Sequence, residues 1–356
     1  MRDNGRRDGG RVSFLLALVL LVQSGCVTVP SGPRWFRGNT HAHTTNSDGN
    51  ATPQDAAAWY KSRGYAFLCI TDHNFLTNAG NSKQLETVVD DGFIVIPSEE
   101  ITQTYIHTCA LNIDRQIPAF YEQNNVDVLR KNLELTERAS GILIVNHPNW
   151  RWAPKTEDLL ATEGIVLFEL YNCSSTVNNE GGEMRPSTEE MWDILLTAGK
   201  VLYAVASDDT TDYTSKISRY TKCPGRGWIT VRADALSPDS ICSAMEAGHF
   251  YASIGVHLST LECSVSRVVV AIDQETTERE LASGTVLGRP ARQDARVGER
   301  IDFIGTGGRL LRSVEGSSAE YVPTEKGYVR ARAVVTREVD GELREYCAWA
   351  QPVFIP

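Results

Sequence analysis

Histidines and acids with the chemistry of metal ligands gather in a few short stretches of this 356-residue chain. Two histidines, His41 and His43, stand one residue apart, and Asp48 follows them closely. Five of the seven histidines and three acids occupy such stretches: His41, His43, Asp48, His73, Glu100, His107, His147 and Asp209. Imidazole with carboxylate is a ligand set for Zn, Mn or Fe, whereas Ca and Mg prefer oxygen alone. Eight candidates exceed the needs of one ion, so we expect two or three divalent transition metal ions.

A cluster of two or more ions suits the hydrolysis of an ester, above all a phosphate ester. The ions lower the pKa of a bridging water and neutralise charge on the phosphoryl oxygens. We therefore expect the substrate to be a small-molecule ester, and a phosphate ester before other esters. The formal net charge of −10 and the lack of a basic stripe argue against nucleic acid as a partner.

Short apolar runs alternate with helical stretches between residues 35 and 257, which predicts an α/β fold with a parallel sheet, open or closed into a barrel. In "TPQDAAAWYKSRG", Thr52 is the expected N-cap of a helix, Pro53 its first residue and Gly64 its end. In such folds the active site lies at the carboxyl ends of the strands. The candidate ligands follow the predicted strands "WFRGNT", "CIT", "IVIPS", "LIVN" and "YAVAS". The sequence thus predicts that they meet at one edge.

The two ends of the chain differ in sequence pattern from residues 35–257. Residues 1–33 combine a basic leader, the apolar run "VSFLLALVLLV" and "QSGC", which together are typical of a signal peptide, and Cys26 is in the position of a lipidated cysteine. We expect an exported protein, either secreted or held in the cell envelope by a lipid anchor on Cys26. From residue 258 to 356, β-branched and aromatic residues predict a small β-rich, sandwich-like domain. The metal-binding domain would span residues 34–257.

The motifs together resemble those of the polymerase and histidinol phosphatase (PHP) superfamily of metal-dependent phosphoesterases, over about residues 36 to 257. The stretches that carry the resemblance are "THAHTTNSDG", "ITDHN", "PSEEI", "IHTCALNI", "VNHPNW" and "ASDDTTD". "GRGW" and "AGHFYAS" further resemble its exported, carbaryl hydrolase-like branch. The resemblance implies a distorted (β/α)7 barrel with metal ions at its carboxyl mouth.

The resemblance also implies a ligand set for each ion. One ion would be held by His41, His43, Glu100 and Asp209, and a second by Glu100, His107 and His147, with Glu100 bridging. The third would use Asp48, His73 and a histidine where this chain has Thr211. A threonine hydroxyl is a poor substitute for imidazole, so we expect two tightly held ions and a third that is weak or absent.

The implied activity is attack on phosphorus by a hydroxide that bridges two ions, with Glu100, His147 and Asp209 as the catalytic residues. Two alternatives stay open at this point. The same metal centre could hydrolyse a carboxylic or carbamic ester, or the chain could be a cell-surface binding protein that has lost activity. Asp72 is expected to orient a ligand histidine.

Overall fold

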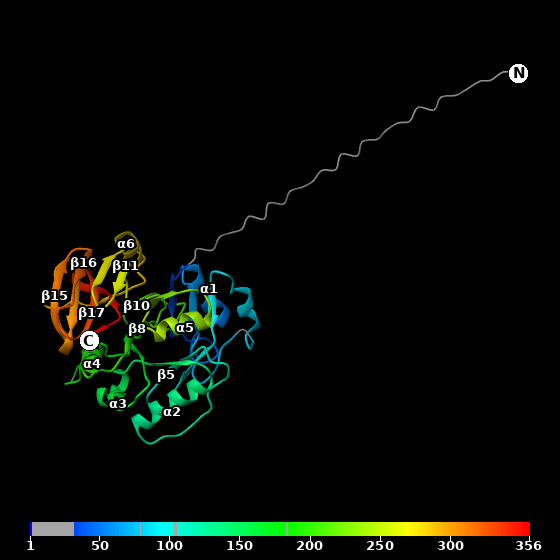
Figure 1. The fold of residues 1–356 in the computed structure, drawn as a ribbon. Helices are drawn as coiled ribbons and strands as arrows, with labels where there is room; N and C mark the ends of the chain where they lie inside the picture. Colours follow the sequence, from blue (N-terminus) through cyan, green and yellow to red (C-terminus); the bar gives the residue numbers. More distant parts are fainter. Residues whose placement is uncertain (2–31, 79, 103–104, 183) are drawn as a thin grey trace. The chain divides into compact units, whose positions relative to one another are not determined.

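The structure is a computed structural model that describes Met1 and residues 32–78, 80–102, 105–182 and 184–356 (Figure 1). The expected signal peptide and the lipid anchor on Cys26 lie outside the described residues. Residues Pro33–Pro356 form one compact unit. No helix within the described ranges is both long and apolar enough to cross a membrane.

One sheet of five strands carries much of the candidate site. Its order is β4 (Ser98–Ile101), β5 (Thr108–Leu111), β6 (Ile142–Val145), β7 (Leu167–Asn172) and β8 (Tyr203–Ser207). The strands β6, β7 and β8 are parallel, as the sequence predicts, and are linked by α3 (Thr156–Leu160) and α4 (Thr188–Thr197). The strand β5 is antiparallel to both β4 and β6, with α2 (Asn125–Arg138) following it. The expectation of a parallel sheet is therefore wrong for β5, whereas β4 runs in the same direction as β6.

A larger sheet contains the first strands of the chain and continues into its last third. The parallel strands β1 (Arg34–Asn39), β2 (Phe67–Cys69) and β3 (Ile94–Ile96) are followed across the sheet by β9 (Trp228–Ala233) and β10 (Phe250–Ser253). The strand β18 (Glu342–Ala350) pairs with β10 and extends the sheet to β17 (Gly327–Val339), β14 (Gly298–Gly305) and β15 (Arg309–Glu315). Two short strands, β13 (Arg289–Pro290) and β19 (Val353–Ile355), pair with β18 and β17.

A separate three-stranded antiparallel sheet completes the β-rich part after residue 257, with α6 nearby in the sequence. It consists of β11 (Leu258–Cys263), β12 (Val268–Ile272) and β16 (Ser318–Tyr321), and α6 spans Gln274–Ala282. Because β18 shares a sheet with β10, the strands after residue 257 and those before it are hydrogen-bonded to one another. The domain boundary at residue 258 stays a prediction.

The remaining helices are short, and α1 has the capping residues that its sequence predicts. In α1 (Pro53–Ser62) the Thr52 side chain accepts a hydrogen bond from Asp55 N, Pro53 is the first residue, and Gly64 follows with φ +77°. The other helical segments are α5 (Pro238–Glu246) and the 3-10 turns η1 (Lys83–Thr87), η2 (Trp150–Trp152) and η3 (Thr306–Gly308). The predicted helix at residues 52–64 is thus confirmed.

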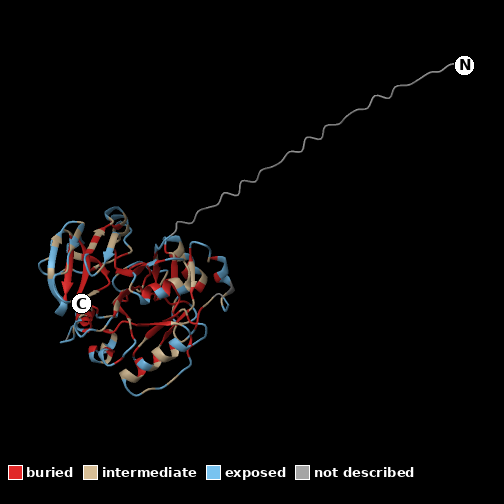
Figure 2. Cartoon of the chain, in the orientation of Figure 1, coloured by how far each residue is buried: buried red, intermediate tan, exposed pale blue. Residues whose placement is uncertain are grey.

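Buried residues occupy most of the strands of the five-stranded sheet and the centre of the larger sheet, whereas β11, β15 and β16 are largely exposed or intermediate (Figure 2). The core joins the β-rich part to the site-bearing sheet. Trp192 of α4 and Trp349 of β18 belong to the same buried cluster. A buried ion pair reinforces this junction, because the guanidinium of Arg330 on β17 makes two hydrogen bonds, of 2.8 and 2.7 Å, to the carboxylate of Asp193 on α4. The helix α4, which links β7 to β8, is thereby fixed to β17.

Candidate metal centre

The two sheets meet at the carboxyl ends of their strands, and the candidate ligands lie at this junction. Two isolated bridges mark it: Ala42, just after β1, pairs with Thr210 after β8, and His73, after β2, pairs with Glu100 on β4. These bridges bring the segments after β1, β2 and β8 beside β4. The expectation that strand ends converge at one edge therefore agrees with the geometry.

Glu100 lies at the centre of five histidines. Its side chain is buried, and its two oxygens are 2.8–3.6 Å from a nitrogen of each ring. The histidines are His41, His43, His73, His107 and His147. Two of these, His107 and His147, together with His41, face the same oxygen, Oε1, at 3.3–3.4 Å. One carboxylate is thus positioned to contact every imidazole of the cluster.

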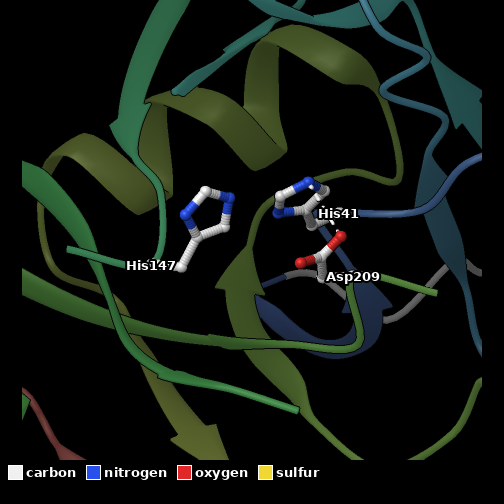
Figure 3. Close-up of side chains that lie close together, drawn as sticks. All are labelled: His41, His147 and Asp209. Carbon is white, nitrogen blue, oxygen red and sulfur yellow. Dashed lines mark ion pairs between the residues drawn. The ribbon is translucent and has the colours of Figure 1, made fainter. Parts of the chain in front are cut away.

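Asp209 approaches the cluster from the end of β8. Its Oδ1 is 3.2 Å from His43 Nε2 and 3.5 Å from His41 Nε2. Figure 3 shows Asp209, His41 and His147 turned toward one another from three separate segments. Both Asp209 and His147 have positive φ, 47° and 25°, a conformation that side-chain-bearing residues rarely adopt and that concentrates at functional sites.

The eight predicted ligands form overlapping groups in which one ligand atom from each member lies within 4.8 Å of the others. The groups are His41 with His43 and Glu100, His41 with His147 and Asp209, Glu100 with His107 and His147, and His43 with Asp48 and His73. The structure thus brings all eight predicted residues together. Their division among the groups resembles the division expected from the sequence, with Glu100 shared by two of them.

Several ligand-type atoms in this cluster are buried without a hydrogen-bond partner. They are His41 Nε2, His43 Nδ1, His73 Nδ1 and Glu100 Oε2. The last two are 2.8 Å apart, yet their orientation does not make a hydrogen bond. Buried polar atoms left unpaired cost free energy, and a bound cation would satisfy lone pairs that converge in this way. The residues present therefore fit a transition metal cluster.

The electrostatics of the cluster lower the pKa of Glu100 and Asp209 and raise the pKa of His41, His73 and His147, whereas burial lowers that of His107. Burial alone would raise the pKa of Glu100, but His41 and hydrogen bonds from His107 and His147 hold it well below its usual value. Burial would lower the pKa of His73, yet the carboxylates of Asp48 and Glu100 raise it to about 10. Metal ions need deprotonated ligands, so ion binding here must displace protons.

The third group, His43 with Asp48 and His73, is more open than the others and lacks a further ligand. The side chain of Asp48 is 51% exposed and that of His73 is 33% exposed. Asp212, next to Thr211, belongs to none of the groups, and its Oδ1 accepts hydrogen bonds from Asn50 Nδ2 and from the backbone of its own turn. The geometry here is compatible with a weaker third site.

Asp72 does not orient a histidine, contrary to expectation. Its carboxylate accepts hydrogen bonds from the backbone and hydroxyl of Thr44, from Ser47 Oγ and from Thr77 Oγ1, at 2.7–2.8 Å. Thr44 and Ser47 lie between His43 and Asp48. Asp72 therefore fixes the turn that carries two candidate ligands, because short hydroxyl and amide donors satisfy its buried charge.

Glu169 on β7 is the functional-site residue that the sequence prediction missed. Its Oε1 lies 2.8 Å from His41 Nδ1, and its Oε2 accepts hydrogen bonds from His147 N at 2.7 Å and Asn172 Nδ2 at 2.9 Å. Burial would raise the pKa of Glu169, but His41 lowers it, so the carboxylate is ionised. The signal in the sequence was an acid inside the apolar run "IVLFELYN", since a buried charge needs partners.

No protein-family model matches this chain, and no curated protein is significantly similar to it in sequence. Among solved structures, a two-domain protein from Bacteroides vulgatus that contains a predicted PHP-like metal-dependent phosphoesterase is similar over 90% of this chain and 96% of its own, with 14% identity and a TM-score of 0.47. A protein from Bifidobacterium adolescentis titled as a metal-dependent phosphoesterase is similar over 48% of this chain and 86% of its own, with 15% identity and a TM-score of 0.36.

An amidohydrolase from Chromobacterium violaceum, with sulfate bound and no metal, is similar over 52% of this chain and 93% of its own, with 12% identity and a TM-score of 0.35.

Proposed function

We propose that this chain is a metal-dependent phosphoesterase of the PHP type. The observation that carries the proposal is the cluster of five imidazoles and three carboxylates at the junction of the two sheets, with buried ligand atoms that no protein group satisfies. Bound ions would supply Lewis acidity and an activated water for ester hydrolysis. We infer two firmly held ions, among Zn, Mn and Fe, and a weaker third.

The protein's own groups have distinct tasks in this proposal. Glu100 would fix the separation of two ions because its two oxygens face different histidines. Asp209 and His147 would complete the ligand sets from the ends of β8 and β6. Glu169 would orient the His41 ring: the Glu169 carboxylate is hydrogen-bonded to His41 Nδ1, so His41 Nε2 faces the cluster.

We also propose that the strands around the site form a distorted barrel of the (β/α)7 type. The bridges from Ala42 to Thr210 and from His73 to Glu100 would close it at the carboxyl ends of the strands. We also propose, from the leader sequence, that the protein is exported and is anchored through Cys26 or secreted.

The test is an ester screen on metal-stripped protein resupplied separately with Mn, Zn and Fe. Aryl phosphates and aryl carbamates are assayed in parallel, and bound metal is counted by elemental analysis. We expect about two ions per chain and turnover of phosphate esters. His147→Ala should abolish turnover and lower the metal content, with the fold intact by circular dichroism.

The matched control is His249→Ala, because His249 is exposed and lies outside the cluster. It should keep both metal and activity. Turnover of carbamates but not of phosphates would contradict the proposed substrate class. Firm metal binding without turnover of any ester would contradict the proposal as a whole and favour a binding role.

A further inference from the structure

A cavity of about 590 Å³ opens beside the candidate metal centre. Three loops line it: the segment between β4 and β5, the segment before α2, and the turn after β6. His107 belongs both to the wall of this cavity and to the group formed with Glu100 and His147. A molecule whose ester group lies at the cluster could therefore extend into the cavity.

Aromatic rings form part of the wall of the cavity, beside polar residues that include Glu122. Trp150 packs against two candidate ligands, with ring centroids 4.7 Å from His107 and 5.4 Å from His147. Tyr105 and Tyr121 also line the cavity, and they are 66% and 81% exposed. Exposed aromatic rings that line a cavity next to a reactive site are suited to pack against a planar ligand.

Arg151 gives the cavity a cationic element. Its guanidinium lies 4.5 Å from the centre of the Trp150 ring and 5.6 Å from that of Tyr105. No carboxylate among the described residues forms an ion pair with it at 4.0 Å or less. Arg151 also has a positive φ of 52°, so the turn presents it in a conformation that the surroundings must hold. A guanidinium without an anionic partner attracts the face of an electron-rich ring.

We infer that this cavity binds the leaving group of the substrate and selects a planar aromatic ring. The substrate class would be aryl monoesters of phosphate, with the phosphoryl group at the cluster and the ring among Tyr105, Trp150 and Arg151. The inference rests on the proposed phosphoesterase function for the position of the phosphoryl group. The aromatic contacts themselves depend only on the cavity.

Binding of two non-hydrolysable phosphonates to metal-loaded protein tests the inference without turnover. Phenylphosphonate and methylphosphonate share the anionic group and differ in the ring. We expect phenylphosphonate to bind roughly 5- to 10-fold more tightly by isothermal titration calorimetry. Tyr105→Ala and Arg151→Gln should each reduce this preference to about 2-fold or less.

The control variants are Tyr220→Ala and Arg63→Gln. Tyr220 is 75% exposed, and Arg63 lies 3.8 Å over the Trp59 ring, so each matches a tested residue in chemistry but lies outside this cavity. Both should keep the preference for the ring. Equal affinity for the two phosphonates, or a preference that neither cavity variant changes, would overturn the inference.

Failure of the proposed function gives a different pattern of results. If no ester is hydrolysed but the ring preference persists and is lost in Tyr105→Ala, the phosphoesterase proposal fails and the cavity assignment stands. If neither phosphonate binds, saturation-transfer NMR with phenol decides, because it needs neither metal nor turnover. Transfer to the phenol ring that Tyr105→Ala removes supports the cavity, and absence of transfer in the wild-type protein refutes it.

Discussion

Glu169→Gln is the substitution that most directly tests how the protein orients its candidate ligands. The two oxygens of Glu169 accept four hydrogen bonds, from His41 Nδ1, Ser207 Oγ, His147 N and Asn172 Nδ2. The side chain is 1% exposed, so water cannot replace a lost partner. Glutamine has nearly the same shape, but one of its two terminal groups only donates.

Either orientation of the new amide removes a contact that matters. If the amide NH2 faces His147 N and the Asn172 side chain, donors meet donors, and the unpaired groups cost about 1–3 kcal/mol. If the NH2 faces His41 Nδ1, that nitrogen must become an acceptor, and the ring proton moves to Nε2. A protonated Nε2 cannot bind a metal ion. In both cases the ligand set around His41 or His147 is disturbed.

The expected result is a 10- to 100-fold loss of metal affinity, the usual effect of removing a group that orients a ligand histidine. This corresponds to about 1.4–2.8 kcal/mol. Affinity is measured by competition with a chromogenic chelator, and the fold is checked by thermal unfolding of the metal-free protein. Glu99→Gln is the control, because Glu99 is buried next to Glu100 but accepts its hydrogen bond from Ile117 N. Metal affinity of Glu169→Gln within 3-fold of that of Glu99→Gln would refute the reasoning.

Three further predictions concern other parts of the molecule. Thr211→His should raise the metal content from about two ions to three by elemental analysis, whereas a third firmly held ion in the native chain would contradict the proposed weak site. Burial would raise the pKa of Glu280, but His257 and Arg37 lower it from 4.5 to about 2. The ionised carboxylate therefore stabilises the folded protein fully above pH 4.5, and this stabilisation is lost as the pH falls toward 2. The free energy of unfolding at pH 7 should therefore be about 2–3 kcal/mol lower in Glu280→Gln than in the wild type, and this difference should disappear as the pH falls below 4.5. The control is Glu278→Gln, which removes the exposed ion pair with Arg337 and should change the free energy of unfolding by less than about 1 kcal/mol. Asp193→Ala leaves the buried Arg330 guanidinium without the carboxylate of Asp193. The free energy of unfolding, measured with denaturant, should fall by about 3–5 kcal/mol. A fall below about 1 kcal/mol would show that the pair does not hold α4 in place.

The convergence of the candidate ligands could be predicted because it follows from strand direction. The segments after β1, β2, β6 and β8 all leave the carboxyl ends of parallel strands, and the sequence marks each end with polar residues after an apolar run. The strand β5 was not among the strands predicted from the sequence. Only residues 102–107 separate β4 from β5, and a parallel crossover needs a dozen or more, so the spacing itself indicated a hairpin.

Glu169 and Asp72 could not be assigned from the sequence, because their roles depend on partners distant in the chain. Glu169 lies 128 residues from His41, and its place in an apolar run does not reveal which side of β7 it occupies. Asp72 directly precedes His73, which suggested contact with a histidine. Its actual donors are the amide and hydroxyl of Thr44 and the hydroxyls of Ser47 and Thr77, and nothing in the "ITDHN" motif indicates them.

Two pairs of adjacent acids, Glu99–Glu100 and Asp208–Asp209, each have one member that faces the histidines and one that binds a loop. In β4 successive side chains point to opposite sides of the strand, so only one of Glu99 and Glu100 can face the cluster. Asp208 and Asp209 follow the end of β8, and the positive φ of Asp209 separates the directions of their side chains. Glu100 and Asp209 face the histidines, whereas Glu99 accepts from Ile117 N and Asp208 accepts from the backbone N–H groups of residues 225–227. The neighbours of the ligand-type acids thus bind the loops that surround the site. In each pair the first acid holds a neighbouring loop through backbone donors and the second faces the histidines, so two adjacent positions divide the structural role from the candidate ligand role.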